Sequence, residues 1–172
     1  MEEHMKNKFE KYVTIRPITL EDYSVVVDWS RDKAFCSANG WEQNRSNEEI
    51  YRWWNLCVSG EIENFIRMGI ECDGRLVGYA DLANIQDNTA ELGIAIGESA
   101  LWGQGIGRAS AMRMIEFASE ELGLEIIDAE VNQDNIRSRR MLEKIGFKEV
   151  SRLGSEEYMG VQGPLIQYRF IQ

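Results

Sequence analysis

The sequence predicts a single α/β domain of the α+β type, with a mixed, mostly antiparallel central sheet of about seven strands and about four flanking helices. Stretches in which apolar and polar residues alternate, typical of strands, are separated by turn signals such as Asp73-Gly74. Other stretches carry apolar residues three or four positions apart, which is typical of helices. The strand, helix and strand between Glu91 and Asn132 require a crossover connection, so two strands of the sheet should be parallel to each other.

The N-terminal part of the chain is predicted to contain a strand, a helix and a loop. The strand covers 14–18 and the helix covers 20–32. Residues 35–45 have the composition of a loop, and Asn39-Gly40 within them is a turn signal. The helix residues expected to face inward are Val25, Val26 and Trp29.

A second helix and an antiparallel meander come next. Ser46, with Glu49 three positions later, forms a capping box that begins the helix. Its inward residues are expected to be Ile50, Trp53, Trp54 and Cys57. Three strands then follow over 65–72, 76–85 and 90–97, joined by short turns.

The C-terminal part is predicted to alternate helices and strands. A long helix ends at Gly123, a strand covers 125–132, and a shorter helix covers 136–145. Two strands over 147–153 and 165–171 follow it. The long helix should bury Met112, Ile115, Ala118 and Leu122, and the strand after it Ile127, Ala129 and Val131.

Length and composition narrow the class of protein. The 172 residues are expected to form one domain, 1–172, in which 1–11 are a polar, flexible tail that does not resemble a signal peptide. That tail, and the lack of an apolar stretch as long as a membrane span, favour a cytoplasmic location. The formal net charge of −10 argues against a nucleic-acid partner and is compatible with a cationic substrate. The three cysteines lack metal-ligand spacing and the one histidine, His4, lies in the tail, so we expect no metal.

A glycine-rich stretch, Trp102-Gly103-Gln104-Gly105-Ile106-Gly107-Arg108, joins the strand over 90–97 to the long helix. Its glycines can adopt φ > 0 and let the backbone approach a ligand closely. The first N–H groups of the helix lack intrahelical partners, and the helix dipole adds positive charge at this end. The stretch therefore predicts an anion site that binds a phosphate or pyrophosphate. The alternative is a tight strand-to-helix turn that binds nothing.

This turn is one of three motifs through which the chain resembles the GNAT superfamily of acyl-CoA-dependent N-acetyltransferases. The other two are Asn135-Ile136-Arg137-Ser138 and Glu143-Lys144-Ile145-Gly146-Phe147, and the opening Ile15-Arg16-Pro17 with Glu21-Asp22 also fits. The chain resembles most the branch of ribosomal-protein N-terminal acetyltransferases and spermidine acetyltransferases. The order of elements matches over nearly the whole chain. The resemblance implies a GNAT-like sheet in which the two parallel strands are splayed apart.

The resemblance also implies acetyl-CoA as the co-substrate. Its pyrophosphate would be held by backbone N–H groups of the glycine-rich turn, which agrees with the anion site. Its pantetheine arm would lie in the gap between the splayed strands and pair with one of them as an added strand would. The family usually has Gln or Arg where this chain has Trp102, but backbone donors do not need that side chain. The implied cofactor-binding residues are Ile94, Ala95, Ile96, Trp102, Gly103, Gln104, Gly105, Ile106, Gly107, Arg108, Asn135 and Ser138.

The implied reaction is direct attack of a primary amine on the thioester, which needs two proton movements. Glu91 occupies the position that resembles the general base of histone-type members and could act directly or through water. Many relatives have a tyrosine acid where this chain has Leu142, so Ser138 is our substitute, as a proton relay or a partner of the sulfur. The alternatives are structural: a hydrogen-bonded Glu91, a Ser138 that only lines the site, and an Asn135 that caps a helix.

The acceptor site is left open by the sequence. In the superfamily it is formed by the first two helices with their loop and by the last hairpin, which here are rich in aromatic and acidic residues. Such groups suit an ammonium ion, and Trp41 in the loop is the best contact candidate. A protein N-terminus, a polyamine, an aminoglycoside or an amino acid derivative would fit as the acceptor. We expect no nucleic acid or membrane as partner, and a homodimer is plausible for the class.

The alternatives to an enzyme are a non-catalytic acyl-CoA-binding module and a nucleotide binder. The turn lacks nucleotide-binding spacing, which disfavours the latter.

Overall fold

The computed structural model describes residues 9–172 of the chain. His4 and most of the predicted tail lie outside the described residues. The strands are β1 (Val13–Pro17), β2 (Ile66–Cys72), β3 (Arg75–Gln86), β4 (Thr89–Ile96), β5 (Ile126–Asn132), β6 (Lys148–Ser151), β7 (Ser155–Tyr158) and β8 (Val161–Ile171). The α-helices are α2 (Tyr23–Trp29), α3 (Lys33–Asn39), α4 (Asn47–Val58), α5 (Ile106–Leu122) and α6 (Ile136–Ile145). Three 3-10 turns are η1 (Glu10–Tyr12), η2 (Leu20–Asp22) and η3 (Ser99–Leu101).

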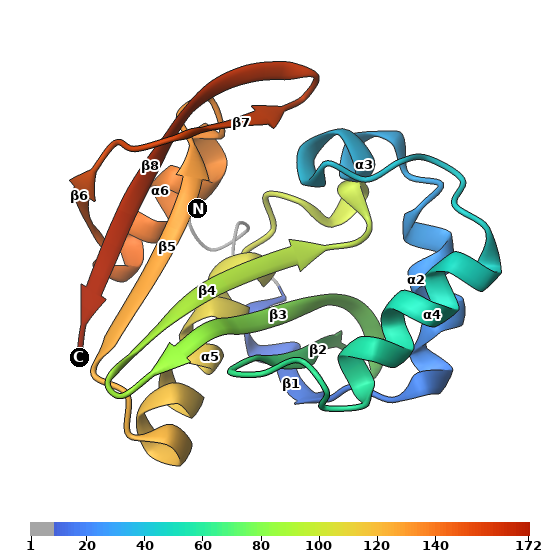
Figure 1. Ribbon diagram of the computed structural model, residues 1–172, viewed down its shortest axis with the longest axis horizontal. Helices are drawn as coiled ribbons and strands as arrows, with labels where there is room; N and C mark the ends of the chain where they lie inside the picture. The colour runs from blue at the N-terminus through green and yellow to red at the C-terminus, as the bar shows by residue number, and fades with distance from the viewer. Residues whose placement is uncertain (1–8) are drawn as a thin grey trace.

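One mixed sheet organises the molecule, with strand order β1-β2-β3-β4-β5-β8-β6 and β7 paired to β8 (Figure 1). Every pairing is antiparallel except that of β4 with β5, which is parallel. The parallel pairing covers only 89–91 of β4 and 126–128 of β5, although both strands continue. Beyond Glu91 and Asp128 the two strands are no longer paired with each other and their ribbons diverge (Figure 1), and we call this interruption of the sheet the gap. The predicted fold class and its splayed parallel pair are confirmed.

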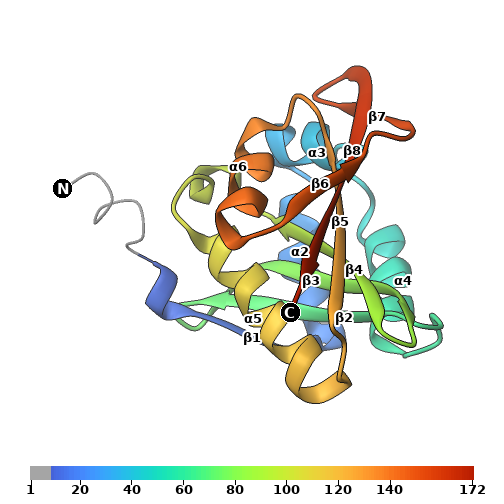
Figure 2. The same ribbon diagram turned by 90° about the vertical axis from the view of Figure 1, so that its left-hand side faces the viewer.

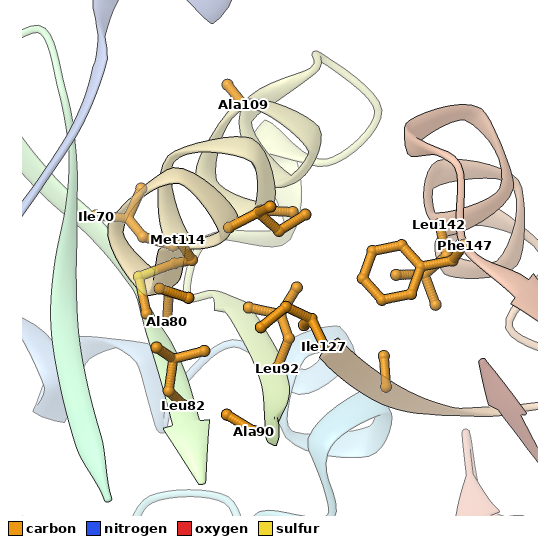
Figure 3. Packing of buried hydrophobic residues seen from close by; sticks show 14 of the residues in the cluster. Ile70, Ala80, Leu82, Ala90, Leu92, Ala109, Met114, Ile127, Leu142 and Phe147 are labelled. Atoms are coloured by element: carbon orange, nitrogen blue, oxygen red, sulfur yellow. The ribbon is translucent and has the colours of Figure 1, made fainter. Parts of the chain in front are cut away.

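Helices cover both faces of the sheet and create two hydrophobic cores. Figure 2 shows α5 and α6 on one side of the strands and α4 on the other. The first core packs α5 and α6 against the sheet, and in Figure 3 Met114 of α5 lies among Ile70, Ala80 and Leu82. The second core lies on the opposite face, where one buried aromatic residue from each of α2, α3 and α4, Trp29, Phe35 and Trp54, packs with Tyr79 of β3 and with smaller apolar residues. Successive side chains of a central strand therefore point alternately into the first and the second core, because residues of a strand alternate between the two faces of the sheet.

Part of the predicted loop over 35–45 is helical, so the loop prediction was wrong for 35–39. Helix α2 ends at Trp29, whereas the predicted helix extended to Asp32. The Asp32 carboxylate instead accepts a hydrogen bond of 3.0 Å from the Phe35 N–H. This N-cap begins α3, and Gly40 ends it with φ 66°. Two signals normally read as loop chemistry, an aspartate and an Asn-Gly pair, here mark the two ends of a short helix.

Three smaller differences between the predicted and the observed elements concern burial on α5 and α4 and the start of β8. Met112, predicted to be inward, is 44% exposed, because the buried stripe of α5 runs one position away, through Ala111, Met114, Ile115 and Ala118. Trp53 and Cys57 of α4 are only half-buried. The last predicted strand begins at Val161 rather than at 165 and pairs with an additional strand, β7.

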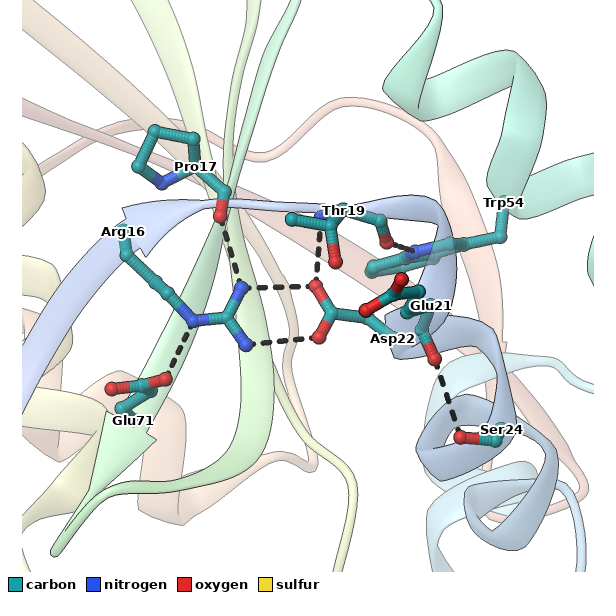
Figure 4. A network of polar contacts seen from close by, with 8 residues as sticks. All are labelled: Arg16, Pro17, Thr19, Glu21, Asp22, Ser24, Trp54 and Glu71. Carbon is teal, nitrogen blue, oxygen red and sulfur yellow. Dashed lines mark hydrogen bonds and ion pairs between the residues drawn. The ribbon is translucent and has the colours of Figure 1, made fainter.

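The Arg16-Pro17 opening motif has a structural role (Figure 4). The Arg16 guanidinium donates two hydrogen bonds of 2.9 Å to the Asp22 carboxylate and one of 2.6 Å to Glu71. It thereby joins β1 to the start of α2 and to β2. Within residues 9–172, no helix is both long enough and apolar enough to cross a membrane.

Candidate active site

A cavity of about 490 Å³ lies where β4 and β5 diverge, between the end of β4, the glycine-rich turn and one face of α6. We call it the splay cavity. Its volume is within the range of small-molecule sites. Of the predicted cofactor-binding residues, Gln104 is not part of its wall, because its amide donates instead to the Ala100 carbonyl at 3.0 Å. The structure brings the others together in this one wall: Ile94, Ala95, Ile96, Trp102, Gly103, Gly105, Ile106, Gly107, Arg108, Asn135 and Ser138.

The three glycines of the turn serve two different geometric needs. Gly103 and Gly105 have φ of 78° and 86°, in the left-handed region that disfavours other residues. Gly105 is the N-cap of α5, so the N–H groups of Ile106 and Gly107 point out of the helix end. Gly107 has no such φ, but a Cβ there would approach the Met141 sulfur to 3.3 Å. The third glycine therefore lets α5 and α6 pack closely beside the cavity.

The edge of β4 that faces the gap offers backbone groups in alternation. The Gly97 N–H donates to the Val77 carbonyl of β3 at 2.8 Å. Because backbone direction alternates along an antiparallel strand, Ala95 also directs its N–H and carbonyl toward β3. Ile94 and Ile96 direct theirs into the gap, where the Ile96 carbonyl accepts a hydrogen bond of 3.0 Å from the Trp102 indole. An added strand would find free groups at Ile94 and at the Ile96 N–H.

The splay cavity is cationic in a chain whose formal net charge is −10. Four basic side chains line it: Arg108, Arg137, Arg140 and Lys144. The buried Arg108 Nε has no hydrogen-bond partner within the described residues. The Arg137 guanidinium lies 4.1 Å from the centre of the Trp102 ring, and burial lowers its pKa. An unpartnered buried donor and uncompensated positive charge suit an anionic ligand with several phosphate groups.

The cations of α6 were not predicted as part of the site, although the sequence carries a signal for them. Arg137, Arg140 and Lys144 recur at positions i, i+3 and i+7, which places them on one face of a helix. Asn135 is the N-cap of α6, because its side chain accepts a hydrogen bond of 3.3 Å from the Ser138 N–H. It also lines the splay cavity, and its binding of the cofactor stays a prediction. Leu142 is only 3% exposed and belongs to the first core.

Glu91 lies apart from the splay cavity, at the last position at which β4 is paired with β5. It borders a second concave region of about 520 Å³ on the opposite face of the sheet, which we call the outer hollow. The Asn84 amide donates a hydrogen bond of 2.6 Å to its carboxylate. Asp128 of the outer hollow is paired to Arg169 at 2.7 Å. Glu91 and Ser138 therefore lie on opposite sides of the gap between β4 and β5.

Most of the aromatic residues considered for an acceptor site belong to the second core. Trp29, Phe35 and Trp54 are buried there, and Trp41 packs edge-on against Phe35 with ring centres 4.9 Å apart. A cation of the chain itself already occupies this aromatic region. The Arg67 guanidinium lies 3.9 Å from the centre of the Tyr79 ring and donates two hydrogen bonds, of 2.7 and 2.8 Å, to Asp81.

The sequence is similar to those of known acetyltransferases. The family described as acetyltransferase (GNAT) domain matches residues 13–148. The chain is 26% identical to the human alpha/beta-tubulin-N-acetyltransferase 9 over 158 residues, covering 87% of this chain and 66% of that protein. It is 31% identical to a putative ribosomal N-acetyltransferase of Bacillus subtilis over 112 residues, covering 63% of this chain and 61% of that protein. Another relative, an uncharacterised protein of Methanocaldococcus jannaschii, is 26% identical, and the chain spans 30% of its length.

Solved structures show the same fold. The spermidine N-acetyltransferase of Vibrio cholerae, in complex with CoA and spermine, superposes with a TM-score of 0.80 at 21% identity, over 94% of this chain and 96% of that one. An aminoglycoside acetyltransferase in complex with coenzyme A gives a TM-score of 0.77 at 16% identity, over 93% and 95% of the two chains.

Proposed function

Because the chain belongs to the GNAT family of acetyltransferase domains, we propose that it transfers the acetyl group of acetyl-CoA to a primary amine by direct attack within a ternary complex. The observation that carries the proposal is the splay cavity, in which a glycine-rich helix start, the unpaired edge of β4 and four cations face one space. A CoA molecule needs these three features, because it has a pyrophosphate, an amide-bearing arm and a further phosphate.

Each part of acetyl-CoA has a matching group in the splay cavity. Backbone N–H groups from Gly103 to Arg108 would hold the pyrophosphate. The pantetheine amides would pair with Ile94 and Ile96 as an added strand. Arg137, Arg140 and Lys144 would compensate the charge of the phosphates.

The positions of Glu91 and Ser138 support a ternary complex. The amine would approach from the outer hollow, where Glu91 accepts a proton from its nitrogen. The neutral amine nitrogen attacks the thioester carbonyl, the carbon–sulfur bond breaks, and the second proton of the nitrogen passes to the departing thiolate on the cavity side, through Ser138. Two substrates that enter from opposite faces need no covalent acyl-enzyme.

The proposed acceptor is a cationic amine. Besides Glu91, the outer hollow contains the carboxylates of Asp128 and Glu130, while Arg169 is engaged by Asp128. A polyamine, an aminoglycoside and a protein N-terminus all carry the required ammonium group.

The cytoplasmic location, the single domain, the homodimer and the exclusion of nucleic-acid and membrane partners stay predictions from the sequence.

A panel of acceptors tests the proposal. The protein is incubated with acetyl-CoA and, separately, with spermidine, kanamycin and an alanyl peptide, and the released CoA thiol is measured. We expect turnover with at least one amine, and its loss in Glu91→Gln. CoA binding without turnover of any amine would instead favour the non-catalytic acyl-CoA-binding module.

A further inference from the structure

We propose that Asn84 is a positioning residue for Glu91, and that the irregularity of β3 next to it serves to present the Asn84 amide. The inference rests on the proposed function, in which Glu91 accepts the amine proton. The observation behind it is the hydrogen bond of 2.6 Å from Asn84 Nδ2 to Glu91 Oε2.

A β-bulge places Asn84 where it is. Ala83 pairs with Glu91 and Gln86 pairs with Thr89, so β3 has two residues, Asn84 and Ile85, opposite one residue of β4. Asn84 adopts φ 48°, in the left-handed region that asparagine tolerates better than most residues. Bulges of this kind re-aim side chains and are frequent next to active sites.

The alternation of side chains shows what the bulge changes. Leu82 faces the first core and is fully buried. In a regular strand, Asn84 would face the same core, because residues two apart share a face. With the extra residue, Ile85 takes the place against the first core, and Asn84 is exposed on the face of Glu91. The bulge is fixed from outside by a hydrogen bond of 3.0 Å from the Ile85 N–H to the Asn64 carbonyl.

The amide holds one of the two carboxylate oxygens of Glu91. Asn84 binds Oε2, and within residues 9–172 no group donates to Oε1, which can accept the proton of the incoming amine. Other charges on this face are paired among themselves: Asp81 of β3 with Arg67 of β2, and Asp128 of β5 with Arg169 of β8. Glu130 of β5, the next charged residue of the outer hollow, accepts a hydrogen bond of 2.7 Å from Gln167. Asn84 therefore supplies the donor that orients Glu91.

Three variants test the inference. Asn84→Gly keeps the left-handed backbone and removes the amide, and Asn84→Asp keeps the shape but replaces the donor with a like charge. Asn64→Gly is the matched control, because Asn64 has φ 53° and contacts the same bulge through a carbonyl that glycine retains. The constants kcat and KM are measured separately with acetyl-CoA and the amine that the panel shows to be turned over fastest. CoA binding is followed by calorimetry.

We expect Asn84→Gly to lower kcat about tenfold with little change in the KM for acetyl-CoA, because the Glu91 carboxylate loses the donor that orients it. Asn84→Asp should lower kcat further, because it replaces the donor with a like charge, while kcat of Asn64→Gly and the CoA affinity of all three variants should stay unchanged. An unchanged kcat in both Asn84 variants, with Glu91→Gln inactive, overturns the inference and leaves the proposed function intact. Full activity of Glu91→Gln overturns the inference and the role of Glu91 as proton acceptor, whereas the absence of turnover with every amine of the panel overturns the proposed function.

Discussion

The indole Nε1 of Trp102 donates a hydrogen bond of 3.0 Å to the carbonyl oxygen of Ile96, across the mouth of the splay cavity. The indole thereby ties the first residue of the glycine-rich turn to the end of β4. Its ring also carries the Arg137 guanidinium, 4.1 Å from the ring centre, so one side chain connects β4, the turn and α6. A glutamine or arginine at this position would not offer an aromatic face to Arg137.

Two substitutions at Trp102 separate these contacts. Trp102→Phe keeps a ring for Arg137 but loses the donor to Ile96, and we expect CoA binding to weaken about fivefold. Trp102→Ala loses the ring as well, and a loss of about 30-fold is expected. Calorimetry with CoA measures both. Equal affinities of the two variants would mean that the stacking with Arg137 contributes nothing.

Gly105→Glu should abolish CoA binding. The side chain would place a negative charge at the start of α5, where the helix dipole and free N–H groups favour an anion, and would strain a residue with φ 86°. A loss of more than about 100-fold is expected. Gly105→Asn is the control, because asparagine tolerates the left-handed region without adding charge. Retained CoA affinity in Gly105→Glu would count against the proposed phosphate site.

Ser138→Ala tests the proton relay. The cap of α6 uses the backbone N–H of Ser138, which alanine keeps, so folding should be little affected. We expect kcat to fall about 10- to 100-fold with little change in the KM for acetyl-CoA. Asn135→Ala, which removes the cap, should instead lower the free energy of unfolding by about 1 kcal/mol. An unchanged kcat in Ser138→Ala would leave Ser138 as a wall residue only.

Asp32 should give the protein a pH-dependent stability. Its carboxylate accepts hydrogen bonds of 3.0 Å from the Phe35 N–H and of 2.8 Å from both the N–H and the hydroxyl of Ser99. Burial opposes ionisation, but these donors outweigh it and hold the pKa of Asp32 below its ordinary value of 3.8. The ionised group therefore contributes stability above that value, and the contribution is lost as the pH falls through the folded-state pKa.

Urea unfolding of the wild type and of Asp32→Asn between pH 3 and pH 7 checks this. The difference in free energy of unfolding should be about 1–2 kcal/mol near neutral pH and should shrink toward the acid end. A difference that is constant with pH would show that charge is not involved.

Breaking the ion pair of Arg67 and Asp81 should destabilise the protein, whereas replacing both residues by apolar ones should not. Their side chains are only 7% and 16% exposed, and Arg67 is surrounded by aromatic rings. Arg67→Met leaves a buried carboxylate unpaired, and a loss of about 3–5 kcal/mol in the free energy of unfolding is expected. The double variant Arg67→Met with Asp81→Leu should recover most of it. If the double variant is as unstable as the single one, the pair itself contributes to stability.

The structure could be predicted from the sequence where a local pattern is compatible with one conformation only. The N-cap at Ser46, where the hydroxyl accepts from the Glu49 N–H, the Asp73-Gly74 turn and the crossover after Glu91 each lie as predicted. It was less informative where a pattern had two outcomes, as at Asp32, whose chemistry suits a loop as well as a helix N-cap. The bulge at Asn84 could not be predicted, because it depends on which residue of β4 lies opposite. The stacking of Arg137 on Trp102 depends likewise on how α6 packs.

The pairing of β4 with β5 ends at Glu91, so the splay cavity and the outer hollow lie beside the same interruption of the sheet, on its two faces. Under the proposed function the acetyl group passes between them, and a molecule in which CoA sulfur is joined to an amine through a short acyl bridge would then occupy both. Once one half is bound, the second meets its site at high effective concentration, so such a conjugate should inhibit far more strongly than CoA or the amine alone. A single bridged compound of this kind is therefore the natural probe for crystallising the reacting arrangement.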